Sequence, residues 1–268
     1  MRFQTGDVVA GYTVESLLGQ GSMGTVYRAR AQDGQTVALK MIGPEGSRER
    51  FQTEAETLWQ LRCPGIPRVF GYAMDPIAYL AEEIIEGPSL EQRLAQGPLS
   101  VAQALGIAYS LLTVLQVIHE HGFVHRDLSP NNILLQGDQA CIIDFGLVRV
   151  LNSDVHPTQL GEILGTPQYL APEQVDPERG PISPSTDIFA AGTLVYRMLT
   201  GVNPIPVASI PRMLRHILTA APPPMVGLGE ELEGAVLKAL EKQPATRYST
   251  ALEFAQALRS AAKQKGNS

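Results

Sequence analysis

Three glycines lie close together near the start of the chain, in the segment LLGQGSMGTVY at positions 17–27. Glycine supplies the positive φ angles that tight turns need, and it lets the backbone approach a ligand closely. Gly19, Gly21 and Gly24 are therefore compatible with a turn that covers a phosphate group and with an ordinary hairpin turn. The spacing G-x-G-x-x-G does not decide between them, because it marks two different nucleotide-binding designs and also arises by chance.

A single lysine follows the glycines. The chain has 21 basic residues, and before Lys238 these comprise fourteen arginines and only one lysine, Lys40. An ammonium group is a compact point charge, whereas a guanidinium group is a planar fork with a different hydrogen-bonding geometry. The composition therefore raises the question of what an ammonium group does at position 40 that an arginine would not do.

The elements around these residues are predicted to be strands. Residues 12–21 and 24–31 alternate apolar and polar side chains on either side of the glycine turn, which is typical of a β-hairpin. Residues 35–42 predict a third strand that carries Lys40, and residues 67–74 and 77–85 predict two more.

One helix is expected among these strands. Residues 47–61 have apolar side chains at helical spacing, with Ser47 as a plausible N-cap. Glu54 lies beside Phe51 and Leu58 on the side that faces inward. A carboxylate is therefore expected on the buried face of this helix.

The rest of the chain is predicted to be mainly helical. Residues 101–121 predict one long helix closed by Gly122, and the apolar segment 186–201 predicts a buried helix. Further predicted elements are short strands at 131–136 and 140–146, a loop-like region at 144–184 and two or more amphipathic helices within 230–262. We therefore expect an α+β fold with a small β-rich lobe and a larger helical lobe. In this single domain of residues 1–268, residues 1–86 form the first lobe and the hinge, 87–262 form the second lobe, and 263–268 form a frayed tail.

Composition excludes several classes of protein. The chain has 268 residues, 44% of them hydrophobic and 18% charged, with a net charge of −6. Nucleic acid and anionic membranes are not expected partners without a basic excess. Cys63 and Cys141 lie far apart in the sequence and lack the spacing of metal ligands, so we expect both to be small core residues. The low cysteine content also favours a protein of a reducing compartment. Residues 101–118 contain polar side chains, which favours a buried helix over a membrane span. We expect a cytoplasmic protein, or the cytoplasmic domain of a longer one.

A second group of polar residues lies in the helical half. The chain reads HRDLSPNNILL at 125–135, DFG at 144–146 and APE at 171–173. Together with the glycine turn, Lys40 and Glu54, this ordered set resembles the serine/threonine type of protein kinase. The resemblance extends from Gly19 to about Arg247, and it looks most like the eukaryotic-type (Hanks-type) kinases of bacteria. It implies the bilobal protein kinase fold, with a cleft between an antiparallel sheet and a helical lobe.

The resemblance implies ATP as the phosphoryl donor and Mg²⁺ as the metal, with Mn²⁺ as a substitute. The implied nucleotide contacts are Gly19, Gly21, Gly24, Val26, Ala38, Lys40, Glu83, Ile85 and Leu134. In the glycine turn, backbone N–H groups would lie against the phosphates. Val26 and Ala38 would enclose the adenine, whose edge would meet the Glu83 carbonyl and the Ile85 N–H group.

The resemblance also implies a set of catalytic residues. These are Asp127, Lys40, Glu54, Asn132, Asp144 and Ser129. Lys40 would hold the α- and β-phosphates, and Glu54 would fix Lys40 in place. Asp127 would orient the substrate hydroxyl and accept its proton. Asn132 and Asp144 would bind the metal, because Mg²⁺ prefers hard oxygen ligands.

Other matching residues have structural roles in the family. Leu58, Leu80, His125 and Phe145 resemble the apolar stack that aligns the two lobes. Asp187 would cap the backbone of the catalytic loop, and Glu173 would form a buried ion pair with Arg247. His125 is expected to be a packed core residue without a proton-transfer role. We interpret His119 and His121 as solvated residues at the end of a helix.

Two positions depart from the family pattern. Ser129 stands where serine/threonine kinases usually carry a lysine that contacts the γ-phosphate, so catalytic strength is open. A serine offers one donor but no positive charge. Glu82 falls where the family usually has an apolar residue at the back of the adenine pocket. A buried carboxylate needs a partner or a raised pKa, so either the register is shifted by one residue or Glu82 has a local polar contact.

The resemblance suggests regulation by phosphorylation. Arg126 and Arg149 could form a basic pocket for a phosphorylated residue of the activation loop. Thr158 is the first candidate phosphosite and Ser153 the second, whereas Thr166 is assigned to substrate positioning. Autophosphorylation between two molecules would require self-association.

Three functions remain open at this point. The favoured one is an active serine/threonine protein kinase that acts on protein substrates. A pseudokinase that binds nucleotide or serves as a scaffold is the second, because of Ser129. The third is a small-molecule phosphotransferase, a class that lacks the A-P-E segment present here.

Overall fold

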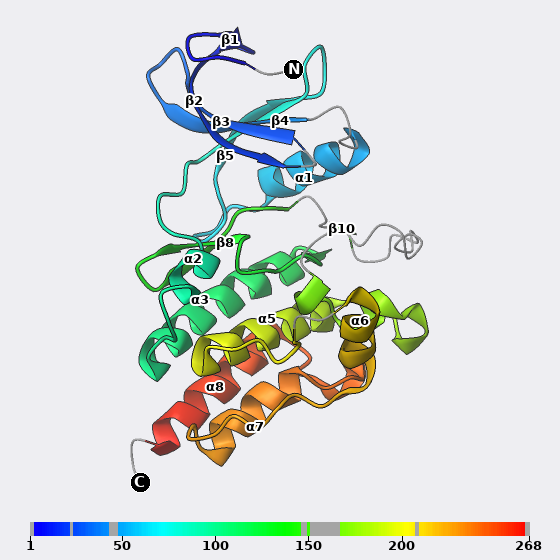
Figure 1. Ribbon diagram of the computed structural model, residues 1–268. Coiled ribbons are helices and arrows are strands. Elements are labelled where there is room, and N and C mark those ends of the chain that lie inside the picture. Colours follow the sequence, from blue (N-terminus) through cyan, green and yellow to red (C-terminus); the bar gives the residue numbers. More distant parts are fainter. Residues whose placement is uncertain are drawn as a thin grey trace.

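The computed structural model describes residues 3–21, 24–42, 48–145, 149–150, 167–206 and 209–265. Figure 1 shows a sheet with one helix at the N-terminal end and a larger group of helices at the C-terminal end. This arrangement confirms the expected α+β, two-lobed architecture. The Ser47 position lies outside the described residues.

The sheet has six strands in the order β1-β2-β3-β4-β6-β5, and each neighbouring pair is antiparallel. The strands are β1 (Val8–Val9), β2 (Tyr12–Gly21), β3 (Gly24–Arg30), β4 (Thr36–Ile42), β5 (Val69–Ala73) and β6 (Tyr79–Glu82). The five longer strands match the predicted segments. The two-residue strand β1 was not predicted, because two residues are too few to show an alternating pattern.

The two faces of this sheet differ. Val37, Leu39 and Met41 of β4 pack in an apolar cluster with residues of β1, β2, β3 and β6. Because side chains alternate along a strand, Ala38 and Lys40 project from the opposite face, toward the helical lobe. Helix α1 (Arg48–Gln60) packs beside β5 and buries Glu54 together with its apolar residues.

The C-terminal lobe consists of helices around two long core helices (Figure 1). The helices are α2 (Leu90–Leu94), α3 (Val101–Glu120), α4 (Pro172–Val175), α5 (Pro184–Thr200), α6 (Ile210–Thr219), α7 (Glu230–Ala239) and α8 (Ala251–Lys265), with 3₁₀ turns at Pro167–Tyr169, Pro177–Arg179 and Pro244–Thr246. The region predicted as loop-like, residues 144–184, therefore contains short helical turns. Helices α4 and α5 each begin with a proline, which is favourable at a helix N-terminus.

Helix α3 is long and apolar enough to cross a membrane, judged by length and composition alone. Its buried residues are Ala104, Ile107, Ala108, Leu111, Leu112, Val114, Leu115 and Ile118. They belong to the main apolar cluster, and α3 contacts α5 and α8. The helix is therefore a core helix of this lobe, as the polar residues in its sequence predicted.

Helix α5 is buried along most of its length, which confirms the prediction for this segment. A Cβ atom on Gly192 would lie 2.9 Å from Cβ of Ala239, so this glycine allows close packing against the end of α7. Helix α8 extends to Lys265, so it includes the first three residues of the segment predicted as a frayed tail. Residues 263–265 are Lys, Gln and Lys, which all have favourable helix propensities.

Two small two-stranded sheets surround the loop that carries Asp127. Strand β7 (Phe123–Val124) pairs with β10 (Arg149–Val150), and β8 (Ile133–Gln136) pairs with β9 (Gln139–Ile142). The segment 125–132 between β7 and β8 is thereby held at both ends. Asp144 follows β9, so these short strands bring it next to the same loop.

Candidate active site

Lys40 lies between two carboxylates from distant parts of the chain. Its Nζ atom is 2.6 Å from Oε1 of Glu54 on α1 and 3.4 Å from Oδ1 of Asp144 after β9. The side chains of Lys40 and Glu54 are 10% and 3% exposed, whereas that of Asp144 is 39% exposed. The structure thus brings together three of the predicted catalytic residues, and it confirms the predicted pairing of Lys40 with Glu54.

The charges around Lys40 keep its ammonium group protonated. Burial alone would lower the pKa of Lys40, but Glu54, Asp144 and Glu82 together raise it above its ordinary value. One cation therefore faces the two carboxylates of Glu54 and Asp144 in this part of the cleft. A site with excess negative charge attracts cations, which favours a divalent metal near Asp144.

Asp187 organises the loop that carries Asp127. Its Oδ2 accepts a hydrogen bond from the backbone N–H of His125, and its Oδ1 accepts one from that of Arg126, both at 2.8 Å. Arg126 has φ = 70°, a left-handed conformation that is costly for a residue with a side chain. The two hydrogen bonds offset this cost and hold Asp127 in place, so the predicted capping role of Asp187 is confirmed.

The interpretation of His119 as a solvated residue was wrong. Its side chain is 6% exposed, and Nε2 lies 2.8 Å from Oδ2 of Asp187. The end of α3 packs against α5, so this histidine is enclosed between the two helices. Burial raises the pKa of Asp187, but the hydrogen bond and charge of His119, together with His125 and the Arg126 N–H, lower it overall. His121 is exposed, as expected.

The apolar stack between the lobes is present. Leu58, Leu80, His125 and Phe145 are all at most 1% exposed. The rings of His125 and Phe145 meet edge to face, with their centroids 5.2 Å apart. His125 is therefore a packed core residue, as predicted.

Asn132, a predicted metal ligand, is held in place by Asp127. Its Nδ2 donates to the backbone oxygen of Asp127 at 3.0 Å and to Asp127 Oδ2 at 3.3 Å. With the amide nitrogen so engaged, the amide oxygen is the atom that can bind a cation. Asn132 Oδ1 and the Asp144 carboxylate are hard oxygen donors, so their chemistry fits Mg²⁺.

Ser129 is 2% exposed, and its backbone oxygen accepts a hydrogen bond from the Asn132 N–H at 3.0 Å. Its side chain thus lies beneath the loop surface. The single donor that the sequence suggested for the γ-phosphate is buried in this arrangement. The backbone of Ser129 therefore helps to hold the loop, and its side chain adds no positive charge to the cleft.

The predicted adenine contacts line the sheet side of the cleft. Val26 pairs with Lys40 across β3 and β4, and Ala38 pairs with Glu82 across β4 and β6, so these side chains share one face. Gly19 pairs with Val26, and Gly21 pairs with Gly24 across the predicted turn. A Cβ on Gly19 would meet no atom of the described residues within 4 Å, so packing there does not require glycine.

The connector between the lobes, residues 83–87, lies beside β8. The backbone N–H of Glu83 donates to the Arg68 oxygen at 2.8 Å, while Ile85 and Leu134 are half-buried nearby in the connector and in β8. A Cβ on Gly87 would lie 2.1 Å from the Leu135 backbone oxygen. The connector can therefore approach β8 only with glycine at position 87, a requirement that the sequence did not reveal.

Of the two explanations offered for Glu82, the shifted register is wrong. The register is as the sequence suggested, because Glu82 pairs with Ala38 on one side and Val69 on the other. Its side chain is buried, and Oε2 has no hydrogen-bond partner among the described residues. The pKa of Glu82 is raised to about 8, mainly by burial. The positive charge of Lys40 lowers this pKa, and the carboxylates of Glu54 and Asp144 raise it. Glu82 thus combines a raised pKa with an Oε2 that lacks a hydrogen-bond partner among the described residues.

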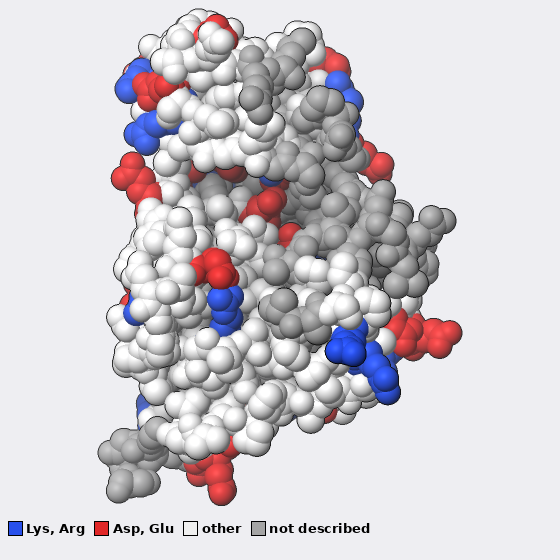
Figure 2. All heavy atoms as spheres, viewed as in Figure 1, with Lys and Arg blue, Asp and Glu red and all other residues white. Residues whose placement is uncertain are grey.

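Figure 2 shows the molecule hollowed between the two lobes, with acidic atoms at the floor of the hollow. The family model for the protein kinase domain matches residues 12–260 of this chain. The chain belongs to the protein kinase family. The match and the two-lobed architecture agree on this point.

Three curated relatives of this kinase domain are bacterial. This chain is 35% identical over 265 residues to the serine/threonine-protein kinase pkn2 of Myxococcus xanthus. The aligned region covers 91% of this chain and 31% of the relative. The chain is 35% identical to the probable serine/threonine-protein kinase PkwA of Thermomonospora curvata, over 91% of this chain and 33% of the relative. It is 34% identical to the serine/threonine-protein kinase PknD of Mycobacterium tuberculosis, over 94% and 40%. The kinase domain thus spans about a third of the length of these relatives.

Membership of this family implies ATP as a substrate, a divalent metal and a protein that accepts the phosphoryl group. The predicted phosphosites Thr158 and Ser153, and Thr166, lie outside the described residues. So does the side chain of Arg149, whose backbone pairs with Val124 in β7. The regulatory assignments therefore remain predictions.

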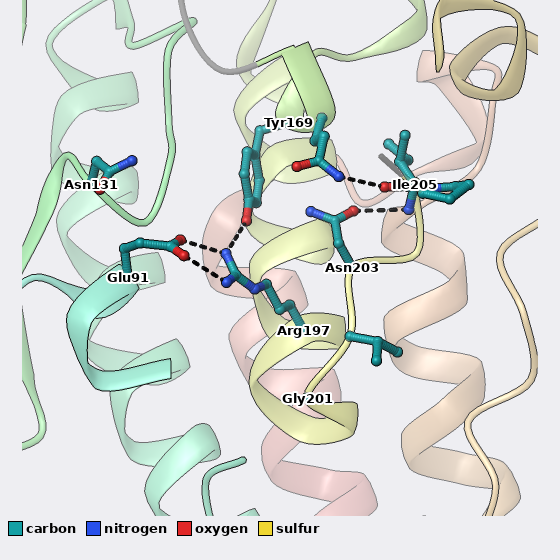
Figure 3. A pocket seen from close by; sticks show the side chains of 10 residues that line it. Glu91, Asn131, Tyr169, Arg197, Gly201, Asn203 and Ile205 are labelled. Carbon is teal, nitrogen blue, oxygen red and sulfur yellow. Dashed lines mark hydrogen bonds and ion pairs between the residues drawn. The ribbon is translucent and has the colours of Figure 1, made fainter. Parts of the chain in front are cut away.

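A second cavity of the kinase domain lies beside the catalytic loop (Figure 3). It has a volume of about 560 Å³, and its polar lining includes Glu91, Asn131, Tyr169, Arg197 and Asn203. Arg197 donates two hydrogen bonds to the Glu91 carboxylate, at 2.6 and 2.8 Å, and one to the Tyr169 hydroxyl at 2.8 Å. This cavity was not predicted, because its lining residues come from segments far apart in the chain.

Proposed function

We propose that this kinase domain transfers the γ-phosphoryl group of ATP to serine and threonine hydroxyls of proteins. The observation that carries the proposal is the Lys40–Glu54 pair at 2.6 Å with Asp144 beside it. A compact cation held between a buried carboxylate and a more exposed one is positioned to receive phosphate oxygens while Asp144 stays accessible to a metal.

Each residue has one task in this proposal. Lys40 binds the α- and β-phosphates, and Glu54 keeps its ammonium group in place. Asp127 orients the attacking hydroxyl and accepts its proton late in the step, so that its main effect is positioning. Asn132 and Asp144 would hold Mg²⁺, or Mn²⁺ as a substitute, which when bound offsets charge on the phosphates.

The nucleotide would lie under β2 and β3. Backbone N–H groups of the turn at Gly19, Gly21 and Gly24 would face the phosphates. The remaining adenine contacts would be Val26, Ala38, Glu83, Ile85 and Leu134. The common face of Val26 and Ala38 supports this placement.

Ser129 favours a second candidate, a pseudokinase that binds nucleotide without transferring phosphate. The absence of a lysine at position 129 removes positive charge where negative charge develops in the transition state, at a cost of about ten- to a thousandfold in rate. The intact Lys40, Glu54, Asp127 and Asn132 favour the active enzyme.

Transfer of labelled phosphate from ATP with Mg²⁺ tests the proposal. The variants are Asp127→Asn and Lys40→Met, with Asp138→Asn in the exposed turn between β8 and β9 as a matched control. We expect labelling of serine or threonine in wild type and control, and a loss of at least about a hundredfold in the two site variants. ATP binding without any labelling would instead establish a pseudokinase.

Regulation by autophosphorylation is part of the proposal. Arg126, with Arg149, would bind phosphate on Thr158, or second on Ser153, while Thr166 would position the substrate. Mapping of phosphosites in the same experiment tests this, and Thr158→Ala is expected to lower activity more than Ser153→Ala. Unchanged activity in both variants would contradict it.

The setting of the domain is also a proposal. Cys63 and Cys141 are free thiols, which favours a reducing compartment such as the cytoplasm. Phosphorylation of one molecule by another would require transient self-association. Labelling whose specific rate rises with protein concentration would support transfer between molecules.

A further inference from the structure

Glu82 is the last residue of β6, directly before the connector. Its pairing with Ala38 places both on the face of the sheet that carries Lys40 and Val26. The next residue, Glu83, is the first of the two connector residues proposed to meet the adenine edge. The Glu82 side chain therefore points into the nucleotide site behind that edge.

The surroundings of Glu82 do not satisfy its carboxyl group. Oε2 is buried and has no hydrogen-bond partner among the described residues, and the whole residue is 7% exposed. The charged groups that act on it are Lys40 on β4, Glu54 on α1 and Asp144 after β9. Lys40 is engaged by Glu54 at 2.6 Å, so its ammonium group is not a dedicated partner of Glu82.

A buried acid in this setting holds its proton at neutral pH. Burial raises the pKa of Glu82 to about 8, and the two other carboxylates act in the same direction as burial. A protonated carboxyl carries one O–H donor and one carbonyl acceptor side by side, as the amide of asparagine or glutamine does.

Adenine offers the complementary pattern on one edge. Its N7 accepts a hydrogen bond and its N6 amino group donates one, which is why asparagine and glutamine recognise this edge with two hydrogen bonds in DNA. If the connector backbone binds N1 and one N6 proton, the other N6 proton and N7 remain for groups behind it. Guanine presents acceptors at both O6 and N7, so it matches this carboxyl poorly.

We propose that Glu82 is a base-specificity residue, whose protonated carboxyl donates a hydrogen bond to N7 of adenine and accepts one from the N6 amino group. The inference deepens the proposed function, since it rests on ATP binding in the same cleft. It assigns to Glu82 a preference for ATP over GTP, and it gives the buried Oε2 a partner when nucleotide is bound.

Binding of ATP and 7-deaza-ATP, which lacks the N7 acceptor, tests the inference. Dissociation constants are measured by calorimetry at pH 7 for wild type, Glu82→Gln and Glu82→Leu. Tyr79→Phe, on the same strand but in the apolar cluster of the other face, is the control. We expect 7-deaza-ATP to bind about three- to tenfold more weakly than ATP in wild type, control and Glu82→Gln. In Glu82→Leu the two ligands should bind within about twofold of each other.

The pH dependence gives a second readout. One unit above a pKa of about 8, only about one Glu82 carboxyl in ten retains its proton. Between pH 7 and 9, the affinity of wild type for ATP should therefore fall about three- to tenfold more than that of Glu82→Gln. Comparison of the two proteins cancels ionisations that they share, including those of Lys40, Glu54 and Asp144. Glu82→Gln keeps the donor and acceptor without this titration.

The outcomes separate the inference from the proposed function. Equal loss on removal of N7 in wild type and Glu82→Leu, or equal pH dependence in wild type and Glu82→Gln, would overturn the role of Glu82 even if phosphate transfer is active. The expected pattern without any transfer would support Glu82 and contradict the kinase activity. Failure of wild type to bind either nucleotide would overturn both.

Discussion

Two clusters of buried charge in this kinase domain differ in how well they are satisfied. In the helical lobe, Arg247 donates to both carboxylate oxygens of Glu173 at 2.7 and 2.8 Å, and the two side chains are 0% exposed. Arg247 also donates to the backbone oxygens of Ser185 and Glu241, and Glu173 accepts from the Thr186 hydroxyl. The charges balance, and both oxygens of the carboxylate have partners.

The cluster in the cleft is not balanced. One ammonium group, Lys40, serves Glu54 and Asp144, while Glu82 is left with a buried oxygen that has no hydrogen-bond partner in the described part of the chain. A charged cluster that only supports the fold gains from full pairing, because unpaired buried groups cost free energy. Groups left unpaired in a cleft are therefore candidates for contact with a ligand.

The largest expected effect comes from breaking the balanced cluster. Arg247→Met leaves the Glu173 carboxylate buried without its cation, so we expect the free energy of unfolding to fall by about 3–5 kcal/mol. Urea denaturation measures this loss. The matched control is Arg179→Met, whose ion pair with Asp176 has side chains 23% and 36% exposed and should contribute about 0–1 kcal/mol. Similar losses in the two variants would contradict the comparison.

Asp187 combines features of both clusters. Its hydrogen bonds are fully formed, as in the helical lobe, but they hold the catalytic loop of the cleft. Asp187→Ala removes the acceptor for the N–H groups of His125 and Arg126, so we expect a loss of about 1–3 kcal/mol in unfolding free energy. Phosphate transfer should fall as well, because the loop at Asp127 loses its support. Urea denaturation and the transfer assay on the same preparation measure the two effects.

The pH dependence of this loss has a definite sign. The pKa of Asp187 in the folded protein is lower than the ordinary value of 3.8. Its contribution to stability is therefore fully present above that ordinary value and is lost as the pH falls through the folded pKa. Wild type and Asp187→Ala should converge in stability at acidic pH. A constant difference down to the lowest pH would mean that the carboxylate charge is not what matters.

Patterns that are local in the sequence were predictable. The strands β2 to β6 and helix α5 were found from periodicity, and the Lys40–Glu54 pair was found through the family resemblance. These features depend on residue types within a short window or within an ordered set of motifs. The described geometry then agrees with them.

Contacts between distant segments were predictable only where the family resemblance supplied them, as it did for Glu173 with Arg247. His119 and Asp187 are 68 residues apart, and Glu91 and Arg197 are 106 apart, so no window contains either pair. The need for glycine at position 87 arises from the backbone of Leu135, in another strand. The burial of Ser129 likewise depends on the folded surroundings of the loop, which residue type alone does not reveal.

Replacement of Glu82 in the unbalanced cluster should increase stability, whereas replacement of Arg247 in the balanced cluster should decrease it. Glu82→Leu removes an unpaired buried carboxyl, so the free energy of unfolding should rise by about 1–3 kcal/mol at pH 8. The unfolded carboxyl ionises near 4.5 and the folded one near 8, so wild type loses stability as the pH rises between these values. Urea denaturation at pH 5 and pH 8 should show a larger gain at pH 8. A gain that is larger at pH 5, or a loss at both values, would refute this reading of Glu82.

The smallest effect is expected at the cavity beside the catalytic loop, where the Glu91–Arg197 pair is balanced but partly solvated. Its side chains are 37% and 20% exposed, and the Arg197 guanidinium lowers the pKa of Glu91. Water weakens such a pair, so Glu91→Gln should cost less than about 1 kcal/mol of unfolding free energy, with a smaller difference at high salt. Arg197 would keep its hydrogen bond to the Tyr169 hydroxyl. Urea denaturation at low and high salt measures this difference. If Glu91→Gln loses as much unfolding free energy as Arg247→Met, the geometry of a pair matters more than its burial for the stability that charged clusters contribute to this kinase domain.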